Sequence, residues 1–244
     1  METERILGLP VDAVTITDII RALPAHTPQN KMTAISVNPQ IALSIKDYPE
    51  LVPFLENSTF RIPDGIGVVL VSKLTKGKVR ERVAGIDLMT AFLEYANQQG
   101  QRIFLYGAKP EINEAAAENI QQQYPHLTIA GRIDGYTQLT DEEIVATMNQ
   151  SKPDFVFVAL GFPRQEKWLA KNYQAVDASV FQDVGGSFDV MSGYVKRAPA
   201  FFVNQHIEWL YRSLQHPSRF YRILQLPVFL LKGLNWHRHN QKGV

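Results

Sequence analysis

Short apolar runs alternate with stretches of helical periodicity over most of the chain. Extended segments are predicted at 5–15, 32–37, 60–63, 102–106, 128–131, 154–160 and 179–184. Helices are predicted between them over 19–23, 40–46, 66–74, 87–99 and 111–123. The first of these has Thr17 or Asp18 as its candidate cap. Another helix is predicted to begin at 141, and one more follows the turn at 161–166 and runs through 171. This alternation favours right-handed crossovers and a Rossmann-like, doubly wound α/β sheet that is mostly parallel.

The stretch from 60 to 69 is the one around which we expect a site to be built. Pro63 and the glycines at 65 and 67 end an apolar run in a turn, which leaves Asp64 at a strand end where a helix opens. A carboxylate there lies near free N–H groups and the positive end of the helix dipole. Asp64 is therefore either a helix N-cap or a general base, and spacing alone favours the cap.

Other apolar runs also end in polar residues and glycines. Because ligands of such sheets bind beyond the carboxyl ends of the strands, we expect these loops to face one crevice. Glycine turns in the crevice are weak candidates for binding a nucleotide phosphate through backbone N–H groups. The residues concerned are Ser36 and Asn38, Gly107, the turn at 161–166, and the pair Gly185 and Gly186.

Several kinds of site are excluded by missing motifs. No run is followed by G-x-G-x-x-G, no G-x-S-x-G elbow is present, and the chain has no Cys. No Asp-x-Asp pair can hold a divalent ion against a nucleotide diphosphate, and no His spacing indicates a metal face. We therefore expect no metal and no cofactor, so that a diphosphate would be neutralised by arginines such as Arg82.

Positive charge is concentrated at the end of the chain. Residues 196–244 hold eight Lys and Arg against one acid, a net charge of +7, whereas the rest holds 17 basic against 23 acidic residues, a net charge of −6. Aromatic residues alternate with the arginines here, and the apolar run at 223–231 is far shorter than the roughly 20 residues that span a membrane. This segment is predicted to form two helices, over 199–215 and from Pro217, which either lie on an anionic membrane or pack on the protein.

We therefore expect a Rossmann-like domain over 1–195, which holds the candidate catalytic residue, and a basic, aromatic helical appendage over 196–244. The first residues carry two acids and no apolar stretch of signal-peptide length, so a cytoplasmic location is expected.

Seven motifs together resemble the WecG/TagA/CpsF glycosyltransferases, and the ending Glu-Trp-Leu-Tyr-Arg at 208–212 is most similar to the TagA branch. Their order and spacing cover almost the whole chain. The motifs are Ser-Val-Asn-Pro at 36–39, Pro-Asp-Gly-Ile-Gly-Val-Val at 63–69, Arg-Val-Ala-Gly-Ile-Asp at 82–87, Phe-Leu-Tyr-Gly-Ala at 104–108, Gly-Phe-Pro-Arg-Gln-Glu at 161–166, Val-Gly-Gly-Ser-Phe-Asp-Val at 184–190 and Val-Lys-Arg-Ala-Pro at 195–199.

The resemblance implies an inverting, metal-independent transferase. It would move N-acetylmannosamine from UDP-ManNAc to the 4-hydroxyl of GlcNAc in undecaprenyl-diphosphate-GlcNAc, the committed step of wall teichoic acid linkage-unit synthesis in a Gram-positive bacterium. It assigns the base to Asp64 and substrate binding to Ser36, Asn38, Arg82 and Gln165, with Arg212, Arg219 and Arg222 of a membrane-docked appendage closing over the site. Family members often carry Thr at the position of Ser36 and Glu at that of Gln40.

The implied partners are a UDP-sugar donor, a lipid-linked diphosphate-GlcNAc acceptor and an anionic membrane on the inner face of the cell membrane. A homo-oligomer is compatible with the tail, and no nucleic acid is expected. Two alternatives stay open, which are a capsule or exopolysaccharide transferase with another UDP-sugar, and a nucleotide-sugar-binding membrane protein without catalysis. The second is disfavoured by Asp64, since a binding module needs no base.

Overall fold

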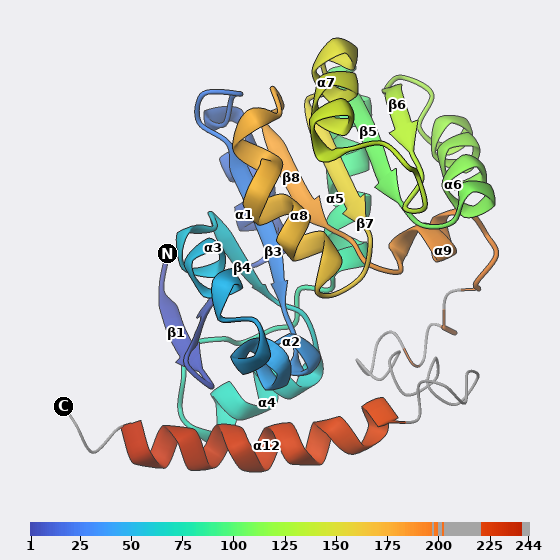
Figure 1. Cartoon of the computed structure of the whole chain (residues 1–244). Helices are drawn as coiled ribbons and strands as arrows, with labels where there is room; N and C mark the ends of the chain where they lie inside the picture. The colour runs from blue at the N-terminus through green and yellow to red at the C-terminus, as the bar shows by residue number, and fades with distance from the viewer. Residues whose placement is uncertain (197, 200–201, 203–220, 241–244) are drawn as a thin grey trace.

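The computed structural model describes residues 1–196, 198–199, 202 and 221–240, with the backbone alone at 221–224. Six strands form one sheet in the order β4-β3-β8-β7-β5-β6, and every neighbouring pair is parallel (Figure 1). This confirms the predicted sheet, with the most continuous apolar run, β7, inside it. The strands are β3 (Met32–Val37), β4 (Phe60–Pro63), β5 (Arg102–Gly107), β6 (Thr128–Ile133), β7 (Phe155–Ala159) and β8 (Val180–Asp183).

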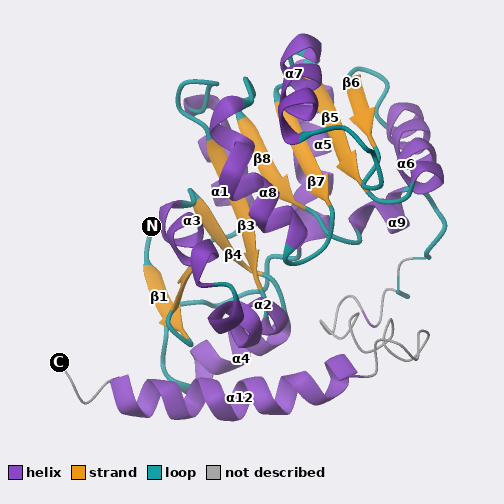
Figure 2. Ribbon diagram, in the orientation of Figure 1, coloured by secondary structure: helices purple, strands orange, loops and turns teal. Residues whose placement is uncertain are grey.

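Successive strand residues point into two separate apolar cores, one on each face of the sheet. Ile35 and Val156 belong to the first core, whereas Ala34 and Phe155 belong to the second. Helices cover both faces (Figure 2), as a doubly wound sheet requires. The first core is covered by α2 (Pro39–Ser44), α3 (Val52–Asn57), α4 (Ile66–Leu74), α7 (Asp141–Ser151) and α8 (Arg164–Asn172), and the second by α1 (Ile16–Ala22), α5 (Gly85–Gln99), α6 (Pro110–Gln123) and α9 (Ser187–Met191).

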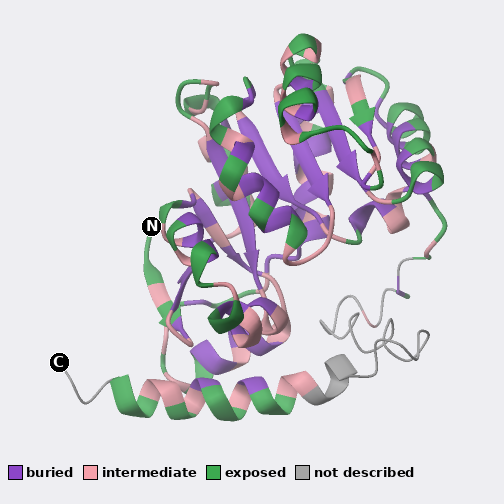
Figure 3. Ribbon diagram, in the orientation of Figure 1, coloured by how far each residue is buried: buried purple, intermediate pink, exposed green. Residues whose placement is uncertain are grey.

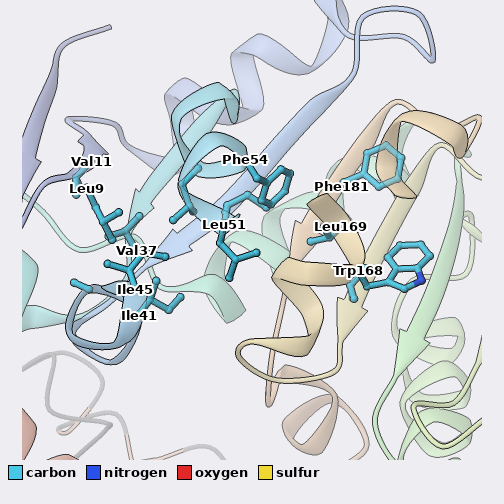
Figure 4. Packing of buried hydrophobic residues seen from close by; sticks show 14 of the residues in the cluster. Leu9, Val11, Val37, Ile41, Ile45, Leu51, Phe54, Trp168, Leu169 and Phe181 are labelled. Atoms are coloured by element: carbon cyan, nitrogen blue, oxygen red, sulfur yellow. The ribbon is translucent and has the colours of Figure 1, made fainter. Parts of the chain in front are cut away.

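An N-terminal hairpin of β1 (Thr3–Ile6) and β2 (Leu9–Asp12) lies beside β4, where the sequence indicated only an extended segment. The buried Asp12 carboxylate accepts hydrogen bonds from Thr3 Oγ1, Arg61 N and Arg61 Nη2, each at 2.7 Å. These bonds satisfy a charge that would otherwise be costly to bury, and they hold the hairpin on β4. Leu9 and Val11 extend the first core, as Figure 4 shows.

Two helix starts differ from the prediction by two residues or more. The first helix is capped by Thr15 and not by Thr17 or Asp18, because Asp18 at the third helical position completes a capping box with Thr15. The helix predicted from Asp87 begins two residues earlier, at Gly85. The described part of the chain also has four single 3₁₀ turns, at Leu23–Ala25, Ile45–Asp47, Pro49–Leu51 and Tyr173–Ala175.

A long C-terminal helix, α12 (Tyr221–Asn240), packs across α2 and α4 (Figure 1). Two glycines allow the close approach, since an added Cβ would lie 2.7 Å from Leu226 Cδ1 at Gly67 and 2.9 Å from Val71 Cγ2 at Gly233. Phe229 is completely buried beneath the helix, whereas much of its outer face is exposed (Figure 3). The helical appendage is thus confirmed for this segment, and α12 is an integral part of the first core.

The helix predicted over 199–215 lies mostly outside the described residues, and the boundary after residue 195 stays a prediction. Among the helices described, none combines the length and apolar character of a membrane span.

Gly233→Val should weaken the attachment of α12, because a branched side chain has no room against Val71. We expect faster hydrogen exchange over 221–240 and a lower thermal stability, with overpacking costing about 1–3 kcal/mol. Asn235→Val is the matched control, since it adds the same side chain at an exposed position of the same helix. Equal exchange in the two variants would show that Gly233 does not hold α12 in place.

Candidate active site

A cavity of about 580 Å³ opens beyond the carboxyl ends of β3, β4, β7 and β8. Its walls come from the loops that follow these strands and from the first turns of α2, α4, α5 and α8. The helix N-termini bring free backbone N–H groups and positive dipole ends to one place, which favours anionic ligands. The crevice expected from the sequence is therefore present, and four strand ends contribute to it.

Asp64 stands at the point where β4 stops and lines the cavity. Its backbone N–H donates to Val37 O at 3.1 Å and to Ile62 O at 2.9 Å, which ties the residue to the ends of β3 and β4. The N-cap of α4 is Gly65, with φ +128° and no side-chain cap. The interpretation of Asp64 as an N-cap is therefore wrong, because the glycine backbone turns the chain before the helix and leaves the carboxylate in the cavity wall.

The start of α5 lies close to the Asp64 carboxylate. A Cβ added at Gly85 would lie 3.5 Å from Asp64 Oδ2 and 3.5 Å from Ser36 Oγ. Gln182 Nε2 donates to Gly85 O at 2.8 Å and so fixes this end of the helix. Carboxylate, hydroxyl and helix N-terminus thus surround one small volume, in which an attacking hydroxyl could meet a base and a leaving anion could meet positive potential.

Two hydrogen bonds to Asp183, the last residue of β8, hold Ser36 in place. The Ser36 N–H donates to Asp183 Oδ1 at 2.8 Å, and its hydroxyl oxygen lies 3.2 Å from the same atom. Both residues are buried. The carboxylate of Asp183 therefore orients the Ser36 hydroxyl group.

The Gln165 side chain joins the ends of β7 and β8. Its Oε1 accepts from Gly161 N and Gly185 N, both at 3.1 Å, and its Nε2 donates to Glu166 Oε1 at 2.9 Å and Asp183 Oδ2 at 3.2 Å. Protein groups thus occupy both amide oxygen and amide nitrogen. In this structure Gln165 fixes the shape of the cavity floor.

Glu166 and Asp183 form a buried carboxyl pair in the cavity wall. Burial raises the pKa of Glu166 to about 7, against the opposing effect of the Gln165 hydrogen bond. Burial and the Glu166 charge raise the pKa of Asp183 well above its usual range, although the Ser36 hydrogen bonds oppose this. The pair therefore retains protons at pH values where exposed carboxyl groups are fully ionised.

Two further predicted residues line the cavity. Asn38 caps α2, since its Oδ1 accepts from Ile41 N at 3.0 Å. Arg82 is half-buried in the loop before α5 and is the one Lys or Arg among the described lining residues. Its guanidinium group is the natural partner for a diphosphate here.

The structure thus brings most of the predicted site residues together. Gly107 does not line the cavity; with φ +117°, its missing side chain lets β5 approach β7, where a Cβ would nearly touch Ala159 O. Arg212 and Arg219 lie outside the described residues, and Arg222 is placed in the first turn of α12 by its backbone alone. The predicted residues that line the cavity are Asp64, Ser36, Asn38, Arg82, Gln165, Gly185 and Gly186.

Sequence reasoning gave no individual role to four residues that line the cavity, Glu166, Asp183, Gln225 and Leu226. Glu166 and Asp183 had a signal, because each is an acid directly beside a glycine-containing turn at a strand end. Gln225 and Leu226 of α12 had none, because their place depends on how the C-terminal helix packs.

Comparison with known proteins identifies the family. The model of the glycosyl transferase WecG/TagA/CpsF family matches residues 4–243. The chain belongs to this family. Relatives of this WecG/TagA/CpsF chain include the N-acetylglucosaminyldiphosphoundecaprenol N-acetyl-beta-D-mannosaminyltransferases of Bacillus subtilis strain 168, 38% identical over 99% of this chain and 94% of the relative, and of Staphylococcus aureus strain MW2, 34% identical over 93% and 90%.

Glu166→Gln should flatten the pH dependence of stability of this glycosyltransferase. Because its pKa is raised on folding, the stability contributed by Glu166 is fully present below about pH 4.5 and is lost as the pH rises through about 7. Glutamine does not titrate, so the variant is spared this loss. Relative to the wild type, its free energy of unfolding should therefore rise by roughly 2–4 kcal/mol between about pH 4.5 and about pH 7. Denaturant unfolding at several pH values measures the difference, and parallel profiles would contradict the buried titration.

Proposed function

We propose that this chain catalyses the reaction for which its relatives are named, the transfer of N-acetyl-β-D-mannosamine to N-acetylglucosaminyldiphosphoundecaprenol. The donor is UDP-ManNAc, and the reaction is the committed step in the synthesis of the linkage unit of wall teichoic acid. The position of Asp64 carries the proposal, because this carboxylate lines the cavity beside Ser36 and the start of α5. A cavity of about 580 Å³ is large enough for a nucleotide-sugar, in the ordinary range for ligand sites.

In the proposed mechanism Asp64 is the general base. It takes the proton of the acceptor 4-hydroxyl as that oxygen attacks C1 of the donor sugar. The C1–O bond to the diphosphate breaks with inversion at C1, and UDP leaves with the electron pair. Arg82 and the first N–H groups of α5 stabilise the negative charge that develops on the diphosphate.

The proposed reaction needs no metal ion. Among the described residues no group of three His, Cys, Asp or Glu is arranged to hold one. Charge on the leaving diphosphate is then balanced by Arg82, the helix N-termini and the basic C-terminal segment.

We also propose that the protein docks on the inner face of the cell membrane through α12 and the end of α4. Leu74 and Leu231 are 62% and 70% exposed. Exposed lysines accompany them at positions 73, 76 and 232, and Lys76 shares a groove with Trp236 and His237. Apolar side chains among basic residues suit the boundary of an anionic membrane, where the lipid-linked acceptor resides.

Asp64→Asn should abolish transfer and leave the fold intact, because the amide keeps the shape and cannot accept the proton. We expect turnover of UDP-ManNAc with a lipid-diphosphate-GlcNAc acceptor to fall about 10²- to 10⁴-fold. A panel of other UDP-sugars in the same assay distinguishes this function from that of a capsule transferase. Near-wild-type turnover of the variant would place the base elsewhere.

Turnover should be the same in EDTA as in Mg²⁺ or Mn²⁺, measured on the same protein sample after dialysis. Activity that is lost in the chelator and restored by either ion would contradict the metal-independent mechanism.

Leu231→Glu should weaken binding to vesicles that contain anionic lipid, because it replaces an exposed apolar side chain with a charge of the same sign as the lipid. A reduction of about tenfold or more is expected from the apolar burial that is lost. Leu139→Glu is the matched control, since Leu139 is also exposed but lies before α7. Binding should also fall as salt rises, and equal binding of the two variants would contradict this docking surface.

A further inference from the structure

Glu166 has one carboxyl oxygen that the described residues leave without a hydrogen-bond partner. The residue is 1% exposed and lines the cavity. Its Oε1 accepts the Gln165 hydrogen bond at 2.9 Å, whereas Oε2 is buried and has no hydrogen-bond partner among the described residues. A buried carboxyl oxygen without a donor is costly, so its persistence at a cavity wall points to a ligand that supplies one.

The local sequence explains why the oxygen is left over. Glu166 is the third residue of α8, where a glutamate ordinarily reaches back to the backbone N–H of the N-cap residue. Here the N-cap is Pro163, which has no N–H. The side chain therefore cannot complete a capping box, and Gln165 satisfies only one of its two oxygens.

We propose that Oε2 of Glu166 accepts a hydrogen bond from a hydroxyl or acetamido N–H group of a sugar bound in the cavity, and so helps to select that sugar. This rests on the proposed function. The ligand group must be a hydrogen-bond donor, which an ionised phosphate oxygen is not, and the adjoining Asp183 carboxyl group adds no positive charge that would attract a phosphate. Sugars offer such donors, and sites built to bind them discriminate strongly against analogues that lack them.

The carboxyl pair also suggests which part of the cavity takes which part of the substrate. Glu166 and Asp183 share the Gln165 amide on the β7 and β8 side. Arg82, the one cation among the described lining residues, belongs to the loop between α4 and α5. The sugar accordingly lies over the carboxyl pair, and the diphosphate lies toward Arg82.

Glu166→Gln tests the assignment, because the amide keeps the size and can still accept from Gln165, but presents an N–H₂ group in place of Oε2. We expect affinity for UDP-ManNAc, measured by calorimetry above the Glu166 pKa of about 7, to fall roughly 10- to 100-fold, the loss expected for one hydrogen bond to a charged acceptor. Affinity for UDP should be unchanged, since UDP carries no sugar beyond its ribose. If the acceptor sugar is the one recognised, KM for the lipid-diphosphate-GlcNAc acceptor rises by that factor instead.

Glu143→Gln is the matched control, because Glu143 is also the third residue of a helix but completes an exposed capping box on α7. Glu166→Asp is a second variant that keeps the charge and withdraws it by one methylene, and the same pattern is expected from it. The proposal is overturned if the Glu166 variants match the control in both the donor affinity and the acceptor KM, or if UDP affinity falls as much as UDP-ManNAc affinity. A wild-type chain that binds UDP-ManNAc but transfers nothing would overturn the proposed function alone.

Discussion

The Gln165 amide is the interaction on which the cavity depends. A parallel sheet fixes where its strands end, but the glycine loops that follow have no side chains to hold them in place. One amide oxygen receives the N–H groups of two such loops, and one amide nitrogen binds two buried carboxyl groups. The floor of the site is thereby a single connected unit, in which a change at any one group alters the hydrogen bonding of the others.

This connection places two kinds of carboxyl group in one cavity. Asp64 stands on the β4 side, close to the start of α5 and to the positive end of that helix dipole. Glu166 and Asp183 are deeply buried, and burial works against their charge. Carboxyl groups in contrasting environments can serve different tasks in the same reaction, one as a base and another as a hydrogen-bond acceptor, without a change of residue type.

The order of strands and helices could be read from the sequence because local signals agreed with the tertiary structure. Met32–Val37 and Ile66–Leu74 match the predicted bounds, since turn residues end each apolar run. The residue pattern alone left Asp64 open between a cap and a base, because the positive φ of Gly65 is not visible in a residue pattern. Glu166 was given no role of its own for another reason. Its burial depends on Pro163 taking the N-cap position of α8 and on Gln165 bridging two loops, and both follow only from the folded chain. The roles of Arg212 and Arg219 remain predictions.

Gly67 gives the Pro-Asp-Gly-Ile-Gly motif a second structural role, which is to make room for the C-terminal helix. Its missing side chain makes room for Leu226 and Phe229 of a helix more than 150 residues later, so the motif that presents Asp64 is also the seat of the C-terminal helix. The two segments are therefore under a shared evolutionary constraint. A larger residue at position 67 would require smaller partners at 226 or 229 and more room beside Pro39, so this motif and the C-terminal helix cannot vary independently.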